Sequence, residues 1–144
     1  MLIGQYSHTI DDKKRLSIPS KWKKVFGKSV VVTRGLDACI FVYTTKEWAN
    51  IAQKLAETSM GSKDARDLNR FFLAGAVEVE LDSAGRILLP DYLKDFAKLK
   101  EKVIFAGLYK RAEIWGDVEW EKKQNEVSSK ADEVASKLQE IGMI

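Results

Sequence analysis

The chain has 144 residues and a mass of 16.3 kDa, about one domain's worth, and 45% of it is hydrophobic and 31% charged. With only two prolines and nine glycines, this composition excludes disordered, collagen-like and low-complexity proteins. The net charge of +3 fits almost any cytosolic protein, but residues 1–40 hold eight basic against three acidic side chains, which indicates either a local anionic partner or a solvated basic face.

No membrane helix is predicted, because the longest run without a charged side chain is residues 1–10, against the roughly 20 residues that a spanning helix needs. The single cysteine, Cys39, cannot form an internal disulfide and is typical of a reducing compartment. We therefore expect a cytoplasmic protein. A chain of this size can bury roughly two-thirds of its extended surface, so a core of its own is possible.

The first predicted unit is a strand, a tight polar turn and a second strand, followed by a short helix. Apolar and β-type side chains alternate before Asp11 and resume after Arg15. This pattern is typical of a hairpin, and the aspartate at the turn can accept backbone N–H bonds. Pro19 cannot donate to a sheet ladder, but it fits the first turn of a helix.

Two apolar strands are predicted next, over 30–33 and 39–43, and a helix should begin near Thr44, where Thr44 and Glu47 have the spacing of a capping box. The apolar face of this helix consists of Trp48, Ile51, Ala52 and Leu55. A linker over 58–62 leads to a further helix, capped by Ser62, that should pack across both halves of the chain. Its inward side chains are Ala65, Leu68, Phe71 and Phe72.

The second half of the chain repeats this unit 71 residues later. Residues 11–19 and 82–90 share the pattern D-x-x-x-R-[IL]-x-[IL]-P, and similar strands follow at 102–107 and 112–116. In the second copy, Gly85 supplies the positive φ that such a turn requires. Lys14 stands at that position in the first copy. Lysine can adopt the left-handed region at a cost of about 1 kcal/mol, so a differently shaped first turn stays open.

The C-terminal segment predicts a long amphipathic helix with a 4-3 apolar pattern that Gln124 interrupts. Its stripe consists of Trp120, Val127, Ala131, Val134, Leu138 and Ile141. We favour packing of this stripe on the chain's own domain, with a subunit contact as the alternative. The expected organisation is a first repeat over 1–57, a connecting helix over 58–75, a second repeat over 76–122 and a C-terminal amphipathic helix over 123–144.

No catalytic or metal site stands out in the sequence. His8 is the only histidine, and Cys39 lies in an apolar strand where a buried, inert thiol is expected. Glu78 and Glu80 share one strand face that is best interpreted as solvated. Trp22, flanked by lysines, can line a groove or pack on its own domain, while the other three tryptophans are expected in the core. We expect no enzyme, cofactor, metal or small-molecule substrate.

These motifs resemble those of the MraZ family of bacterial regulators, which carry two swapped-hairpin units of the SpoVT/AbrB type in one polypeptide. The resemblance covers nearly the whole chain, to about residue 130, and its main departure is Lys14 in place of a glycine. It rests on Met-Leu-x-Gly-x-Tyr at the N-terminus, Asp11 to Pro19, Cys39 with Tyr43 and Glu47-Trp48, Arg70-x-x-x-x-Gly75-Ala76, Leu81 to Pro90, and Glu113-Ile114-Trp115 with Trp120. The implied fold is α+β, with two swapped-hairpin units forming a small β-barrel-like core with peripheral helices.

The resemblance also implies a function, namely sequence-specific DNA binding and transcriptional regulation, with repression as the expected effect. The implied target is a cell-division and cell-wall gene cluster that includes the protein's own gene, bound at short repeated promoter boxes. The implied assembly is a ring-shaped homo-oligomer associated with the nucleoid. In proteins of this kind the arginine of each D-x-x-x-R loop faces DNA and the aspartate shapes the loop.

This role transfers to Arg15 and Arg86, with Lys13 carried over from the first motif, and Lys14 is added on its charge alone. The candidate DNA-binding residues are Lys13, Lys14, Arg15 and Arg86, and the loop-shaping residues are Asp11, Asp82 and Gly85. Arginine on a rigid turn can make a bidentate contact with guanine in the major groove, while lysine suits phosphates. Both tips can lie on one face of a subunit, and a ring would multiply modest contacts on repeated boxes.

Two other functional classes remain open from the sequence. The chain can be a protein-binding adaptor that inhibits a partner enzyme through its C-terminal helix, with the basic loops merely solvated. It can also bind RNA, although Trp22 is the single candidate for an exposed stacking platform.

Overall fold

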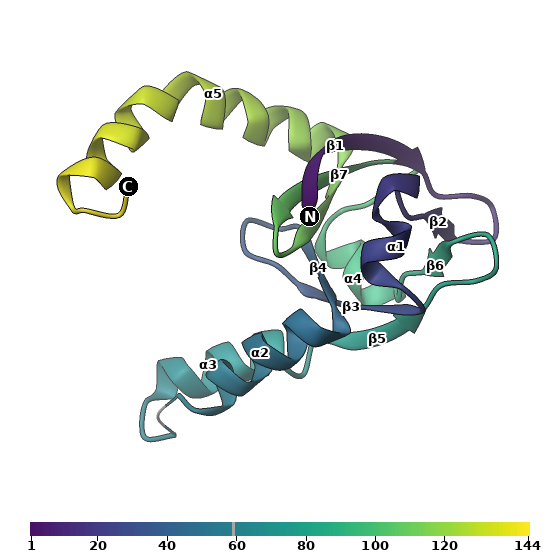
Figure 1. Ribbon diagram of the computed structural model, residues 1–144, viewed down its shortest axis with the longest axis horizontal. Coiled ribbons are helices and arrows are strands. Elements are labelled where there is room, and N and C mark those ends of the chain that lie inside the picture. Colours follow the sequence, from purple (N-terminus) through teal and green to yellow (C-terminus); the bar gives the residue numbers. More distant parts are fainter. Residues whose placement is uncertain (59) are drawn as a thin grey trace.

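The computed structural model describes residues 1–58 and 60–144 and shows two similar runs of strands and helices (Figure 1). The first run contains β1 (Leu2–Thr9), β2 (Arg15–Ser17), the 3-10 turn η1 (Ser20–Trp22), α1 (Lys23–Phe26), β3 (Ser29–Arg34), β4 (Ile40–Thr44), α2 (Thr45–Ala56) and α3 (Lys63–Phe72). The second contains β5 (Val77–Glu80), β6 (Arg86–Leu88), α4 (Asp91–Phe96), β7 (Lys102–Tyr109), β8 (Ala112–Gly116) and α5 (Asp117–Glu140). Within this described part, no helix is both long enough and apolar enough to span a membrane.

The strands on either side of each polar loop pair with the other repeat and not with each other. β1 lies antiparallel to β7, β5 to β3, and β2 to β6. The predicted local hairpins are therefore wrong as to their partners. β1 has eight residues and its neighbour β2 only three, so pairing β1 along its full length requires the eight-residue strand β7 of the second repeat.

The remaining predicted strand pairs are confirmed, because β3 pairs with β4 and β7 pairs with β8 inside their own repeats. The main sheet has six strands in the order β1-β7-β8-β4-β3-β5, and β2 and β6 form a separate two-stranded ribbon. The α+β class with two repeats is thus confirmed. β1 and β5 are edges of the main sheet, so the sheet is not a closed barrel.

The main hydrophobic core joins the six-stranded sheet to the β2–β6 ribbon and to the short helices. Leu16 and Ile87, at the centres of β2 and β6, are buried in the same cluster as Phe105 of β7. Trp22 is 2% exposed, and its ring lies edge-on to those of Tyr6 and Phe105 at centroid distances of 5.2 and 5.9 Å. Trp22 therefore packs on its own domain, one of the two placements that the sequence allowed.

A second cluster packs α2, α3 and the start of α5 against the main sheet. Its buried members are Cys39, Phe41, Tyr43, Ile104 and Trp115, and its partly buried members include Trp48, Phe72 and Trp120. Burial raises the pKa of the Cys39 thiol far above its ordinary value, and the nearby Glu113 carboxylate adds to the rise. The prediction of a buried, inert thiol is confirmed.

Both predicted helix caps are present. The hydroxyl of Thr44 at α2 and that of Ser62 at α3 each accept a hydrogen bond from the backbone N–H three residues on, at 3.0 and 3.3 Å. The linker predicted over 58–62 includes residue 59, which lies outside the described residues. Leu68 of α3 was predicted to face inward but is 42% exposed, because α2 and α3 lie side by side and extend beyond the sheet (Figure 1).

The C-terminal helix α5 leaves the body of the protein instead of packing along it (Figure 1). Its first turn contacts the sheet, where the rings of Trp120 and Trp115 lie 5.6 Å apart. Val127 and Val134 of the predicted apolar stripe are 57% and 47% exposed. The expected packing on the chain's own domain is therefore wrong over most of the helix. A helix of 24 residues is about 36 Å long and outruns the five-residue strand β8 from which it starts.

Two neighbouring residues of β6 test the packing of the ribbon. Ile87 is 1% exposed and Leu88 is 58% exposed. Ile87→Ala should lower the free energy of unfolding by about 2–5 kcal/mol, because it leaves a cavity in the core. Leu88→Ala should change it by about 0.5 kcal/mol or less. Urea unfolding measures both, and equal losses for the two variants would contradict the packing described.

Candidate nucleic-acid interface

The loop between β1 and β2 is organised by one carboxylate. Asp11 Oδ1 accepts hydrogen bonds from the backbone N–H groups of Lys13 and Arg15 at 2.9 and 2.8 Å, and its Oδ2 accepts one from Arg15 Nε at 2.8 Å. The backbone closes the turn with a 2.9 Å bond from Lys14 N to Asp11 O. The aspartate thus fixes both the backbone of the turn and the side chain of its arginine.

The loop between β5 and β6 repeats this geometry atom for atom. Asp82 Oδ1 accepts from the backbone N–H groups of Ala84 and Arg86, both at 2.9 Å, and Oδ2 accepts from Arg86 Nε at 2.8 Å. Gly85 N donates to Asp82 O at 2.9 Å. The two copies of D-x-x-x-R therefore form the same structural unit, as the shared sequence pattern predicts.

Lys14 and Gly85 occupy the same left-handed position, with φ values of 63° and 77°. The first turn accordingly has the shape of the second, and the question left open by Lys14 is answered. Lysine adopts this conformation at a cost of about 1 kcal/mol and places a cation at the tip of the loop. The departure from glycine changes the charge of the first loop and leaves its backbone unchanged.

Each aspartate leaves part of its arginine available. Arg15 and Arg86 use Nε to bind the carboxylate, and within the described residues their terminal nitrogens make no hydrogen bond or ion pair. Each arginine side chain is 30% exposed. The guanidinium is therefore oriented by one edge while its other nitrogens can bind a ligand, which is the arrangement that bidentate recognition requires.

The pairing of β2 with β6 brings the two arginines to one face. Ser17 pairs with Arg86 and Arg15 with Leu88, while Leu16 and Ile87, the middle pair, point into the core. Since side chains alternate across a strand, Arg15 and Arg86 share the outer face as diagonal neighbours, a relation that places residues roughly 7–8 Å apart. Figure 1 shows both loops at the same end of the molecule, opposite α5 and the α2–α3 pair.

The two predicted lysines of the first loop differ in their surroundings. Lys13 and Lys14 are both exposed at the tip. Lys14 Nζ lies 3.7 Å from Asp91 Oδ1 of α4, and Lys94 Nζ lies 3.1 Å from the same oxygen. Asp91 therefore offsets part of the positive charge of Lys14, whereas no such contact to Lys13 is present in the described structure.

Sequence reasoning missed two residues beside the loops. Leu88 lies opposite Arg15 on the outer face and is 58% exposed, so the face has an apolar centre. The alternation of β6 around the buried Ile87 is the signal that would have found it. Lys23 of α1 donates from Nζ to Ala84 O at 3.1 Å, a contact across 61 residues that no local pattern indicates.

The outer face also has acidic neighbours. Arg15 and Arg86 line a hollow of about 390 Å³ together with Glu78 and Glu80 of β5. Both glutamates are exposed, as predicted for a solvated strand face. In the part of the chain that is described, no group of three or more histidine, cysteine or acidic side chains is placed to hold a metal ion.

The fold and the loops together define a class of protein: a double-repeat α+β chain whose repeats exchange strands and present two aspartate-held arginine loops side by side. The family described as "MraZ protein, putative antitoxin-like" matches the chain twice, over residues 1–71 and 72–140. The two matches divide the chain at one point, between residues 71 and 72. The finer boundaries predicted at residues 57, 75 and 122 therefore stay predictions.

Relatives agree with this match over the full length of the chain. A protein named transcriptional regulator MraZ from Thermoanaerobacter sp. (strain X514) is 47% identical over 143 residues, covering 99% of this chain and all of the relative. A protein with the same name from Caldanaerobacter subterraneus is 48% identical over 138 residues, covering 96% of this chain and 96% of the relative. Another from Alkaliphilus oremlandii is 44% identical over 143 residues, covering 99% of this chain and all of the relative. The chain belongs to the MraZ family.

The loop geometry makes a prediction about pH. The backbone N–H of the following arginine lowers the pKa of Asp11 and of Asp82 below the ordinary 3.8, and the arginine side chain contributes further. A lowered pKa means that the aspartates stabilise the loops above about pH 3.8 and that this is lost as pH falls through the lower, folded-state pKa. Carboxyl carbon NMR titration should give midpoints below 3.8 for both, and a midpoint at or above 3.8 would contradict the geometry.

Proposed function

We propose that the protein is a DNA-binding transcriptional regulator that contacts the duplex with the outer face of the β2–β6 ribbon and its two loops. The observation that carries this proposal is the duplicated arrangement itself, in which two arginines are held by aspartates on one rigid face. The relatives over the full chain are named transcriptional regulators, which supports the same function. The proposed location is the cytoplasm, at the nucleoid.

The spacing of the arginines fits one groove of DNA. Arg15 and Arg86 are diagonal cross-strand neighbours, which lie roughly 7–8 Å apart. Successive base pairs are about 3.4 Å apart along the helix axis, so the two side chains can reach base pairs about two steps apart. A two-stranded ribbon fits into the major groove, where arginine can bind guanine O6 and N7 and the apolar Leu88 can contact a thymine methyl group.

The lysines of the first loop have a different proposed role. Lys13 and Lys14 lie at the tip, where they can bind phosphates that flank the groove and so set the position of the ribbon without reading sequence. Asp11, Asp82 and Gly85 shape the two loops.

The proposed sites are short repeated boxes in the promoter of a cell-division and cell-wall gene cluster that includes the protein's own gene, with repression as the effect.

Alanine variants of the two arginines test the interface. Arg15→Ala and Arg86→Ala should each weaken binding to a promoter fragment by about 1–3 kcal/mol, because each removes one base contact. Gel-shift titration with DNA from upstream of the gene measures the change. Arg70→Ala is the matched control, since Arg70 lies on α3 and is bound to Asp67 at 2.9 Å. Unchanged affinity in the folded double variant Arg15→Ala, Arg86→Ala would contradict the proposal.

In the same titration, the affinity of the wild-type protein for DNA should fall steeply as the salt concentration rises, because binding to phosphates releases counterions. A flat salt profile would argue for a partner other than nucleic acid. Each phosphate neutralised adds about −0.9 to the slope of log affinity against log salt concentration. Protection of single-stranded RNA in preference to duplex DNA would favour the RNA alternative. Co-purification of a protein partner, without protection of DNA, would favour the adaptor.

We also propose that the protein acts as a homo-oligomer, in the form of a ring, and that α5 contributes to the contact between copies. The apolar stripe of α5 is exposed over about two helical turns, from Val127 to Val134, and together with the partly buried Leu138 it lines a mainly apolar hollow of about 370 Å³. One chain has a net charge of only +3, so repeated subunits on repeated boxes would supply binding strength that a single subunit lacks.

A charge in the α5 stripe tests the proposed assembly. Light scattering should give a mass several times 16.3 kDa for the wild-type protein and a smaller mass for Val134→Glu, because a carboxylate would be buried at the contact. Ser136→Glu adds the same charge on another face of the helix and should leave the mass unchanged. A monomeric wild-type protein, or a Val134→Glu variant of unchanged mass, would contradict this assembly.

A further inference from the structure

The two loops have the same backbone but unequal charge at their tips. Between its aspartate and its arginine the first loop has Asp12, Lys13 and Lys14, whereas the second has Ser83, Ala84 and Gly85. The second loop therefore has no cation of its own besides Arg86. If both loops bind the same duplex, as proposed above, one of them lacks the phosphate-binding charge of the other.

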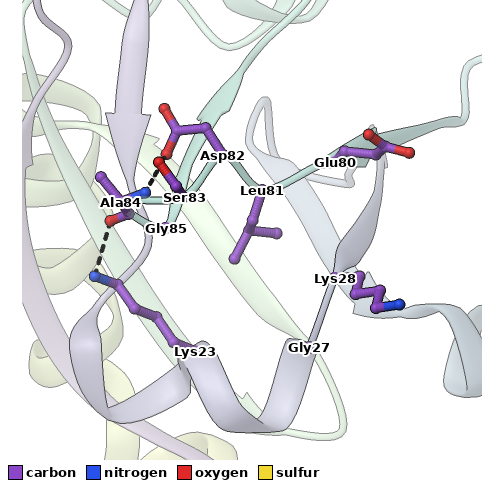
Figure 2. A pocket seen from close by; sticks show the side chains of 9 residues that line it. All are labelled: Lys23, Gly27, Lys28, Glu80, Leu81, Asp82, Ser83, Ala84 and Gly85. Atoms are coloured by element: carbon purple, nitrogen blue, oxygen red, sulfur yellow. Dashed lines mark hydrogen bonds between the residues drawn. The ribbon is translucent and has the colours of Figure 1, made fainter.

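A lysine from the first repeat lies directly on the second loop. Lys23 of α1 extends across to this loop, and its Nζ donates a 3.1 Å hydrogen bond to Ala84 O (Figure 2). Its stem covers Gly85, which is buried, and a Cβ placed on Gly85 would fall 2.4 Å from Lys23 Cε. Gly85 adopts its positive φ without strain, and its missing side chain leaves the space that the Lys23 stem occupies.

The equivalent contact in the other half of the molecule is replaced. Lys94 of α4 stands 71 residues after Lys23, yet it binds Asp91 at 3.1 Å instead of the first loop. Lys14, which has a side chain where Gly85 has none, lies 3.7 Å from the same Asp91 oxygen. The first loop therefore has its own lysine, and the adjacent helix α4 presents a carboxylate to it. The second loop has a glycine at that position, and the adjacent helix α1 supplies the lysine.

We propose that Lys23 is part of the DNA-binding surface at the second loop, where it positions Ala84 and contributes the phosphate-binding cation that Ser83-Ala84-Gly85 lacks. An ammonium group has three donors, and the bond to Ala84 uses one of them. Among the described residues, no carboxylate lies within ion-pair distance of Lys23 Nζ, so its charge is not offset as that of Lys14 is. This inference rests on the proposed DNA-binding function.

The surroundings of Lys23 leave room for a phosphate. Lys23 and the second loop line a hollow of about 690 Å³, whose far side is formed by Gly27, Lys28 and Glu80. Figure 2 shows the ammonium of Lys23 at the loop, while Lys28 and Glu80 lie at the opposite end. The surface around the second loop is accordingly composite, with its arginine from the second repeat and its lysine from the first.

The test compares two neighbouring lysines by gel-shift titration over a range of salt concentrations. Lys23→Met keeps an apolar stem and removes the ammonium, whereas Lys24→Met makes the same charge change at an exposed residue that lies next to it in sequence. Lys23→Met should weaken binding roughly fivefold to tenfold and reduce the salt slope by about one. The loss should be alike on promoter and unrelated DNA, and Lys23→Arg should restore both values.

Equal affinity and equal salt slope for Lys23→Met and Lys24→Met, with Arg86→Ala still defective, would overturn this inference alone. If Arg86→Ala instead bound DNA with the affinity of the wild-type protein, the proposed function itself would be overturned. Amide hydrogen exchange of the DNA-free protein adds a second measurement. Lys23→Met should speed exchange at residues 84–86 and leave residues 13–15 unchanged. Faster exchange without any change in the salt slope would show a purely structural lysine and would also overturn the inference.

Discussion

The antiparallel pairing of β2 with β6 is the contact on which the rest of the molecule depends. Each strand has only three residues, and each contributes one fully buried side chain, Leu16 or Ile87, to the core. Burying two such side chains contributes roughly 3–6 kcal/mol of hydrophobic free energy. Because the strands come from different repeats, this pairing also requires the repeats to exchange their neighbours.

The exchange explains the position of the loops. β1 and β5 are held at opposite edges of the main sheet, yet the loops that follow them converge on one ribbon. Two aspartates then hold two arginines on the outer face of that ribbon, with the same hydrogen bonds in each copy. The DNA-binding surface that we propose is thus a product of the fold and exists in neither repeat alone.

Much of this arrangement was predictable from local sequence. Turn residues, caps and apolar periodicity depend on neighbours within about four positions, so the sequence predicts the backbone N–H bonds that Asp11 and Asp82 accept and the caps at Thr44 and Ser62. The partners of β1, β2, β5 and β6 were not predictable, because periodicity identifies a strand without specifying what it pairs with. The same limit hid Lys23, whose contact is 61 residues away, and misplaced the α5 stripe, whose environment depends on where the sheet ends.

Contact of both loops with the same stretch of DNA can be tested by directed cleavage. The only cysteine is buried Cys39, so Asp12→Cys and Ser83→Cys, at matching positions of the two loops, can each be labelled with a tethered iron chelate. On DNA from upstream of the gene, we expect both labelled proteins to cleave within each promoter box, a few base pairs apart. Cleavage from one loop only, or from neither in a protein that still protects the DNA, would contradict it.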